Sequence, residues 1–374
     1  MGYSVVIVAG LVIIGGGLAG LTAAFRLASR VPVTLLEAAP RLGGQILTEL
    51  ADGFVIERGA EGFVFRSQAV PAVARDLGMP ETELIGQSVM RSYGFDGERL
   101  VALQPGEAAS FLGFQVSKED LGKGIRSLRR GMGSLVSAFE GNLRERVSLR
   151  LSARASDLQR HANGVRVQLA SGASLDADAV IVATGAATAA RLLQPLLGTE
   201  TAALASAPTL SSVTVELAYP REAIEHPLDA TGFVVAEAAQ QDGLRACTFT
   251  SSKFADRAPP GKISLRLFMR PNAEDIMNLD DAAFVERAER GLARALSVRG
   301  RPLRAWVSRW KDALPVFTDA HRAQVAVIEQ ALAGLPIALA GSAFHGAGID
   351  AAVRSGEAAA ATLPERAPSL KLSK

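Results

Sequence analysis

The sequence has few of the residues that disulfide-bonded proteins, metal sites and nucleic-acid binders need. Its 374 residues include one cysteine, Cys247, so no disulfide can form within the chain and no paired-cysteine motif exists. We expect Cys247 to be a packed core residue. The four histidines are scattered without the spacing of metal ligands, so we expect no metal site. Lys and Arg number 40 against 38 Asp and Glu, a balance that argues against a nucleic-acid partner.

Glycine, by contrast, is abundant, and the first cluster of it lies in an uncharged segment. The chain has 36 glycines, and five of them fall within residues 5–24, which carry no charge. Twenty apolar residues are long enough for a membrane helix. The glycines favour the alternative, in which a buried parallel strand at residues 8–14 enters a glycine turn and a helix at 21–29. Residues 1–7 have no assigned role.

The segment Gly15–Gly20 matches the GxGxxG pattern of a dinucleotide-binding turn. A short apolar run at 32–36 follows the expected helix, and Glu37 ends it 22 residues after Gly15, near the ~20 expected for a carboxylate that binds a ribose. Such a carboxylate would repel a 2′-phosphate, which disfavours NADP. The helix start would bind the pyrophosphate. The expected contacts are Gly15, Gly17, Leu18, Ala19, Gly20, Glu37 and Ala38.

The next motif favours a flavin over a nicotinamide cofactor. Residues 37–44 read Glu-Ala-Ala-Pro-Arg-Leu-Gly-Gly, and this resembles the E-x3-R-x-G-G motif of the amine-oxidase-like flavoenzymes. Residues 177–185 and 336–350 resemble two later segments of that superfamily. The resemblance implies non-covalent FAD. It also implies cofactor contacts for Arg41, Gly43, Gly44, Ala183, Thr184, Gly341, Gly348 and Ile349.

Within that superfamily, residues 41–63 are most similar to the protoporphyrinogen/coproporphyrinogen oxidases. Gln45 stands where amine oxidases usually carry arginine, and residues 127–135, 310–321 and 341–353 resemble later motifs of the oxidases. The chain departs from their pattern as well. Its connection at about 110–124 is tens of residues shorter than their helical substrate segment. Three further departures are Arg130, Phe317 and Ala351.

The resemblance implies oxidation of a porphyrinogen in haem biosynthesis, either protoporphyrinogen IX or coproporphyrinogen III. Hydride would pass to flavin N5, with dioxygen as acceptor and peroxide released, although a quinone acceptor stays open. The flavin would carry the chemistry, so no side chain is assigned a catalytic role. Arg66 would bind a substrate propionate. Two alternatives remain: an amine oxidase or desaturase acting on another hydrophobic substrate, and a flavoprotein that has lost its substrate site.

The expected fold class is α/β, with a Rossmann-like FAD-binding domain of the amine-oxidase type interleaved with an α+β substrate domain. The FAD-binding domain would comprise residues 1–80, 124–205 and 331–363, and the substrate domain 81–123 and 206–330. The expected details are strands at 212–217 and 263–268, a helix at 281–296, a loop at 251–262, a flexible tail at 364–374, and His321 and His345 in turns or at the surface. We expect a cytoplasmic protein with a possible peripheral contact to the inner membrane. The sequence does not indicate the oligomeric state.

Overall fold

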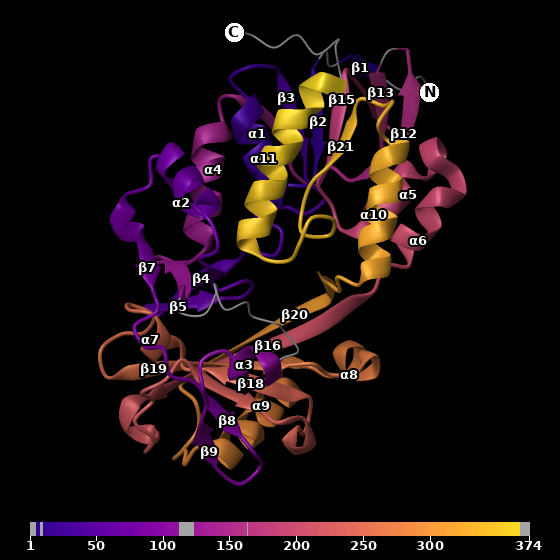
Figure 1. The fold of residues 1–374 in the computed structure, drawn as a ribbon. Helices are drawn as coiled ribbons and strands as arrows, with labels where there is room; N and C mark the ends of the chain where they lie inside the picture. The colour runs from indigo at the N-terminus through magenta and orange to yellow at the C-terminus, as the bar shows by residue number, and fades with distance from the viewer. Residues whose placement is uncertain (1–4, 8–9, 112–122, 163, 367–374) are drawn as a thin grey trace.

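A five-stranded parallel sheet forms the centre of the upper half of the molecule in Figure 1. The computed structural model describes residues 5–7, 10–111, 123–162 and 164–366. The sheet has the order β11-β3-β2-β15-β21, and every pairing in it is parallel. Its strands are β2 (Leu11–Ile14), β3 (Val33–Leu36), β11 (Val147–Arg150), β15 (Ala179–Val182) and β21 (Ile337–Leu339). Segments far apart in the sequence therefore build one sheet.

Both faces of this sheet are covered, which explains its continuous apolar strands. All four residues of β2 are buried; Leu11 and Ile13 pack on one face, and Val12 and Ile14 on the other. Helices α1 (Leu18–Leu27), α2 (Ala69–Asp76), α4 (Gly133–Leu143) and α11 (Ile349–Arg366) lie on the first face. The second face carries α5 (Ala186–Leu197) and α10 (Asp319–Ala331).

A smaller sheet of order β1-β14-β13-β12 also packs on the second face, beside α5. Its strands are β1 (Val5–Ile7), β12 (Ala155–His161), β13 (Gly164–Leu169) and β14 (Ser174–Ala177). Two short helices follow α5, namely η2 (Gly198–Thr201) and α6 (Ala202–Ala205). This layer completes the upper half of the molecule (Figure 1).

A seven-stranded mixed sheet of order β20-β16-β19-β18-β17-β8-β9 forms the lower half (Figure 1). Its strands are β8 (Tyr93–Phe95), β9 (Leu100–Ala102), β16 (Thr209–Pro220), β17 (Gly232–Val235), β18 (Leu244–Thr248), β19 (Lys262–Met269) and β20 (Arg304–Pro315). One face packs on α9 (Asp281–Ala295) through Phe284, Ala288 and Leu292. The other short helices of this half are α3 (Glu107–Phe111), η3 (Arg221–Ala223), η4 (Glu237–Ala239), α7 (Thr250–Lys253) and α8 (Ala273–Asn278).

The opposite face of the large sheet meets a hairpin that follows the glycine-rich segments. The hairpin consists of β4 (Thr48–Ala51) and β5 (Phe54–Glu57). Phe54 and Ile56 pack there with Ala218 and Trp306 in a small apolar cluster. Beside it lie β6 (Phe63–Val64), η1 (Glu81–Glu83), β7 (Leu84–Gly86) and β10 (Ile125–Leu128), with β10 between the other two strands. The hairpin thus joins the two halves of the molecule.

The α/β class and the mixture of a parallel and a largely antiparallel sheet are confirmed, whereas several element boundaries differ from the prediction. The strand expected from residue 8 begins at Leu11. Gly10, just before it, has a φ of +149°, and a Cβ there would lie 2.4 Å from the carbonyl oxygen of Pro32. Residues 8 and 9 lie outside the described residues. Residues 5–7, which had no expected role, form β1 and pair with β14. The helix expected from Leu21 already starts at Leu18.

Two expected irregular segments are partly helical. The segment 251–262, expected to be a loop, begins inside α7, which reaches Lys253. The prediction of a flexible tail at 364–374 is wrong for residues 364–366, because α11 continues to Arg366. Residues 367–374 lie outside the described part of the chain. The division into two interleaved domains at the expected residue numbers stays a prediction.

The structure also bears on the uncharged segment near the N-terminus. Of residues 5–24, the described ones form two short strands and the start of α1, not one long helix. Among the described residues of the chain, no helix has the length and apolarity that a membrane crossing requires. The expected cytoplasmic location and peripheral membrane contact stay predictions.

Candidate functional site

The glycine-rich turn between β2 and α1 packs tightly at two positions and borders open space at a third. A Cβ on Gly15 would lie 2.3 Å from the carbonyl oxygen of Ala183, and a Cβ on Gly20 would lie 2.0 Å from that of Gly15. Packing therefore requires glycine at both positions. A Cβ on Gly17, in contrast, would meet no atom within 4 Å. The backbone at Gly17 is therefore open to the close approach of a ligand.

The start of α1 presents hydrogen-bond donors next to Gly17. Gly17 is the N-cap of α1; no side chain caps the helix, and its first turn contains no acidic residue. The N–H groups of the first turn, including those of Leu18 and Ala19, have no acceptor within a helix. The helix dipole adds a partial positive charge there. A phosphate or pyrophosphate group fits this set of donors.

Glu37 lies at the end of β3, beside the same turn. Its Oε2 accepts a hydrogen bond from the backbone N–H of Gly16 at 2.7 Å, and its Oε1 accepts one from Ala39 at 2.7 Å. Each carboxylate oxygen can accept a further hydrogen bond. Glu37 is therefore held by the backbone and still has acceptor capacity for hydroxyl groups. The neighbouring Ala38 is exposed.

Arg41 supports the second glycine turn through backbone carbonyl groups. Its guanidinium donates to Leu42 at 3.0 Å, Ile46 at 3.1 Å and Gly44 at 2.8 Å. Gly43 and Gly44 have φ values of +98° and +55°, a conformation that favours glycine. The N–H of Gly43 donates to the carbonyl oxygen of Gly16 at 2.8 Å, and a Cβ on Gly44 would lie 3.2 Å from Cα of Gly17. The two glycine turns therefore lie against each other.

The remaining expected cofactor residues gather at the same edge of the parallel sheet. Ala183 and Thr184 follow the carboxyl end of β15, and the Cβ of Ala183 lies 3.3 Å from a Cβ built on Gly20. A Cβ on Gly341, just beyond β21, would lie 3.8 Å from that of Ala19. Helix α11 begins at Ile349, directly after Gly348. Ligands of open parallel sheets bind at the carboxyl ends of the strands. This edge is the candidate site, and contact of each residue with a cofactor stays a prediction.

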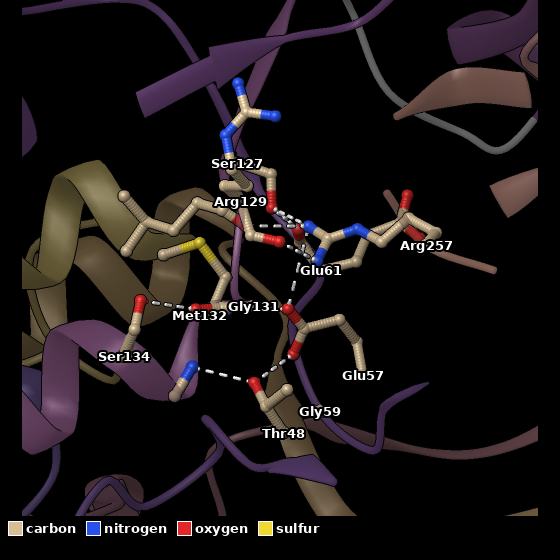
Figure 2. A network of polar contacts seen from close by, with 12 residues as sticks. Thr48, Glu57, Gly59, Glu61, Ser127, Arg129, Gly131, Met132, Ser134 and Arg257 are labelled. Atoms are coloured by element: carbon tan, nitrogen blue, oxygen red, sulfur yellow. Dashed lines mark hydrogen bonds and ion pairs between the residues drawn. The ribbon is translucent and has the colours of Figure 1, made fainter. Parts of the chain in front are cut away.

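A buried carboxylate, that of Glu57, lies in a network of polar contacts (Figure 2). Glu57 is 2% exposed, and its Oε1 accepts from the N–H of Met132 at 2.6 Å, at the start of α4. Its Oε2 accepts from the hydroxyl of Thr48 at 2.7 Å, which in turn accepts from the N–H of Gly133 at 2.7 Å. Burial raises the pKa of Glu57, although these hydrogen bonds and Arg257, 4.0 Å away, act in the opposite direction. The network fixes the end of β5 to the start of α4.

Arg257 is the fully buried cation of this network. Its guanidinium donates to the hydroxyl of Ser127 at 2.6 Å and to the carbonyl oxygens of Leu128 at 3.0 Å and Arg129 at 3.3 Å (Figure 2). Burial lowers the pKa of Arg257, and the neighbouring carboxylates oppose that shift. The loop that carries Arg257 is thereby fastened to β10.

A second buried charge cluster lies where the large sheet meets the segment after β5. Lys253 and Glu61 form an ion pair, and Arg266 lies 3.6 Å from Glu61 and donates to the carbonyl oxygen of Gly59 at 2.5 Å. Burial would raise the pKa of Glu61, but Lys253 and Arg266 together hold it below its ordinary value. Burial raises the pKa of Glu216 to about 7, against the opposing effects of Arg266 and Ser264.

Arg66, the expected partner of a propionate, follows β6 and is exposed at the surface. Its backbone N–H donates to the carbonyl oxygen of Val64 at 2.8 Å. Contact of its side chain with a substrate stays a prediction. The connection at 110–124, which was expected to be shortened, also concerns substrate binding. Residues 112–122 of it lie outside the described residues.

The expectation for the two histidines near the C-terminus is wrong for His321 and confirmed for His345, which lies in a bend and is exposed. His321 is buried, not in a turn or at the surface, and its Nε2 lies 2.8 Å from the carbonyl oxygen of Ala343. The side chain of His345 is partly exposed but is bonded to Ser355 and Glu329. The expectation for Cys247 is confirmed, because it is buried in the core of the large sheet, and burial raises the pKa of its thiol.

Sequence reasoning missed the buried polar residues that support the site. Glu57 ends an apolar strand that reads Phe-Val-Ile-Glu, and a carboxylate at the end of a fully buried strand was a signal that could have identified it. Ser355 lies in an alanine-rich helix and gives no comparable signal. The partners of Arg257 come from β5 and β10, so only the folded chain brings them together.

Comparison with known proteins agrees with this architecture. A model of the flavin-containing amine oxidoreductases matches residues 87–364, and a model of the NAD(P)-binding Rossmann-like domain matches residues 13–77. A coproporphyrinogen III oxidase of Bacillus subtilis is 24% identical, over 93% of this chain and 96% of the relative. That alignment runs over 458 positions, more than this chain has residues, so the relative contains segments without a counterpart here.

Two further proteins show the same similarity. A coproporphyrinogen III oxidase of Propionibacterium freudenreichii is 32% identical over 60% of this chain and 42% of the relative. A crystal structure from Exiguobacterium sp. 255-15, of a proposed protoporphyrinogen oxidase, superimposes with a TM-score of 0.81 at 24% identity, over 97% of this chain and 99% of the other. That structure shares the fold. The match to residues 87–364 covers well over half of the sequence, and the chain therefore belongs to the flavin-containing amine oxidoreductase family.

Proposed function

We propose that this flavin-dependent oxidoreductase holds FAD non-covalently and oxidises a porphyrinogen to the porphyrin in haem biosynthesis. The observation that carries the substrate class is the similarity to coproporphyrinogen III oxidases over nearly the full length of both chains. Bound FAD would supply the hydride acceptor. Dioxygen is the proposed terminal acceptor, with hydrogen peroxide as its product. Protoporphyrinogen IX and coproporphyrinogen III are the two candidate substrates.

The geometry of the glycine turns supports a dinucleotide form of the flavin. The uncapped start of α1 would donate its N–H groups to the two phosphates, and the open backbone at Gly17 would allow them to approach. Glu37 would accept hydrogen bonds from the ribose hydroxyls, because both of its oxygens are already oriented by backbone N–H groups. A flavin mononucleotide, with one phosphate and no adenosine ribose, would leave Glu37 without a ligand.

The loop after β21 and the start of α11 would lie at the flavin ring. The N-terminus of α11 carries the partial positive charge that favours a reduced, anionic ring. Gly341, Gly348 and Ile349 are the proposed contacts there. Arg66 is the proposed partner of a substrate propionate, because a guanidinium binds a carboxylate through two parallel hydrogen bonds. Its solvent exposure is compatible with an incoming anionic substrate.

The test is an anaerobic mixing experiment with the purified, FAD-loaded protein. Freshly reduced coproporphyrinogen and protoporphyrinogen are mixed with the protein separately, and the visible flavin absorption is followed together with porphyrin fluorescence above an enzyme-free blank. Bleaching with one porphyrinogen and not the other would identify the substrate. Admission of air should then restore the flavin absorption with release of peroxide. Bound FAD without bleaching by either compound would refute the proposed substrate class.

The second candidate is an amine oxidase or desaturase acting on another hydrophobic substrate. The relatives' extra segments favour it, because this chain lacks counterparts of parts of the coproporphyrinogen III oxidases. Gln45 favours the first candidate. Its side chain donates to the carbonyl oxygen of Ala313 at 2.5 Å and therefore joins the second glycine turn to β20. Flavin bleaching by a hydrophobic amine and by neither porphyrinogen would select the second candidate.

A further inference from the structure

The loop between β21 and α11 contains three glycines in a backbone conformation that other residues rarely adopt. Gly341, Gly346 and Gly348 have φ values of +120°, +113° and +98°. Glycine reaches these values readily, but it also has more alternative conformations than any other residue. A loop with three such glycines needs contacts from outside to hold one arrangement. The same loop carries the residues proposed to contact the flavin.

One set of outside contacts is a hydrogen-bond chain that crosses from α11 to α10. The N–H of Gly341 donates to the hydroxyl oxygen of Ser355 at 2.7 Å, and both residues are buried. The Ser355 oxygen lies 2.6 Å from Nδ1 of His345. Nε2 of His345 lies 2.8 Å from Oε1 of Glu329. Ser355 and Glu329, 26 positions apart in the sequence, are thus joined through one imidazole.

Every group in this chain is satisfied by a single assignment of hydrogens. Ser355 accepts from Gly341 and donates to Nδ1, so a neutral imidazole must carry its hydrogen on Nε2, where Glu329 accepts it. All the donors then point the same way, from the loop to the carboxylate. Hydrogen bonds aligned in this manner polarise one another and strengthen each other. A substitution at Glu329 should therefore weaken the hydrogen bond that Gly341 donates to Ser355.

Neighbouring contacts also hold the loop, but the N–H of Gly341 depends on this chain. The carbonyl oxygen of Gly341 accepts hydrogen bonds from the backbone N–H groups of Phe344 at 3.1 Å and His345 at 3.3 Å. Nε2 of His321 donates to the carbonyl oxygen of Ala343 at 2.8 Å. Asp350 accepts from the hydroxyl of Ser67 at 2.5 Å, which fixes the start of α11. The N–H of Gly341 is bonded to Ser355 alone among side chains, and Gly341 lies against Ala19 at the start of α1.

We propose that Glu329, His345 and Ser355 are positioning residues that fix the Gly341–Gly348 loop in the conformation that binds FAD. The proposal rests on the proposed function, because it assumes that FAD lies at this loop. None of the three residues is assigned contact with the cofactor. Without the chain, the loop would leave its binding conformation more often, both before FAD binds and while it is bound. The affinity for FAD would then fall in proportion, and its release would be faster.

The test measures FAD release from the intact, FAD-loaded full-length protein. After dilution, the rise in FAD fluorescence gives the release rate, and a thermal melt with excess FAD gives Tm. Ser355→Ala removes the acceptor of Gly341, and Glu329→Ala removes the end of the chain at a partly exposed position. Both variants should release FAD about tenfold faster than the wild type. Glu329→Gln keeps an oxygen acceptor for Nε2 and should release FAD nearly as slowly as the wild type.

Thr362→Ala is the matched control, because its hydroxyl lies exposed on the same helix and bonds only to the carbonyl oxygen of Ala358. This control should leave the release rate unchanged. Release at the wild-type rate in both Ser355→Ala and Glu329→Ala, whether or not Tm falls, would overturn the positioning role. A wild-type protein that retains no FAD would instead refute the proposed function, and the positioning role with it.

Discussion

The carboxylate of Glu57 accepts a hydrogen bond from the backbone N–H of Met132, 75 residues further along the chain, at 2.6 Å. This contact joins the end of β5 to the first turn of α4, where an anion is favoured by the helix dipole. Helix α4 in turn supports the glycine turns, because the side chain of Val136 lies 3.1 Å from a Cβ built on Gly43. A buried acid is therefore linked to the candidate cofactor site through one helix.

Replacement of Glu57 should be costly in a way that depends on the replacement. Glu57→Ala would leave the N–H of Met132 without a partner and would remove the carboxylate that lies 4.0 Å from the buried Arg257. Removal of one member of a buried charge pair costs about 3–5 kcal/mol. Glu57→Gln also removes the charge but keeps an acceptor for Met132, so it should cost less than Glu57→Ala. Denaturant unfolding of both variants measures the difference. Equal losses would show that the charge, not the hydrogen bond, is what stabilises this junction.

Alanine substitutions at two glycines of the same turn should differ in their effect, one on stability and the other on FAD binding. A Cβ on Gly20 would lie 2.0 Å from the carbonyl oxygen of Gly15, so Gly20→Ala should destabilise the fold by about 1–3 kcal/mol through overpacking. A Cβ on Gly17 meets no protein atom, so Gly17→Ala should leave Tm nearly unchanged and weaken FAD binding. Thermal melts and FAD titration of both variants check this. Gly17→Ala with unaltered FAD affinity would argue that the phosphates lie elsewhere.

Glu37 should matter for the fold and for the cofactor together. Glu37→Ala removes the acceptor of two backbone N–H groups, and unsatisfied groups of this kind cost about 1–3 kcal/mol where they are buried. The same variant should weaken FAD binding and should affect FMN binding much less, because FMN has no adenosine ribose. Parallel titrations with FAD and FMN measure the two effects. An equal loss for both ligands would place the adenosine away from Glu37.

What could be predicted from the sequence was local, and what could not was produced by contacts between distant segments. The run of apolar residues before Gly15 and the spacing to Glu37 were enough to predict the parallel sheet and its glycine turn, because both depend on neighbours in the chain. His321 was assigned to a turn or the surface, since a lone histidine carries no sign of burial; its partner Ala343 lies 22 residues away. Helix α11 ends at Arg366, within the flexible tail that was expected to begin at residue 364.

The buried carboxyl of Glu216 should make the stability of the protein depend on pH. Its pKa rises from 4.5 to about 7 on folding, mainly because burial disfavours its charge. Between these values the folded state binds the proton that the unfolded state has lost, so stability falls as pH rises from about 4.5 to about 7. The shift corresponds to about 3 kcal/mol. Burial raises the pKa of Glu57 as well, so its contribution has the same sign.

Glu216→Gln isolates the contribution of this one group, because the amide resembles the protonated acid and still accepts from the hydroxyl of Ser264. Unfolding free energies of the variant and the wild type should agree near pH 4.5 and diverge above it, with the variant more stable at pH 8. Glu286→Gln, an exposed change on α9 with the same loss of charge, is the control and should follow the wild type. If Glu216→Gln and the wild type lose stability in parallel over this range, Glu216 is already ionised in the folded protein, and the ion pairs of Arg266 must then include it.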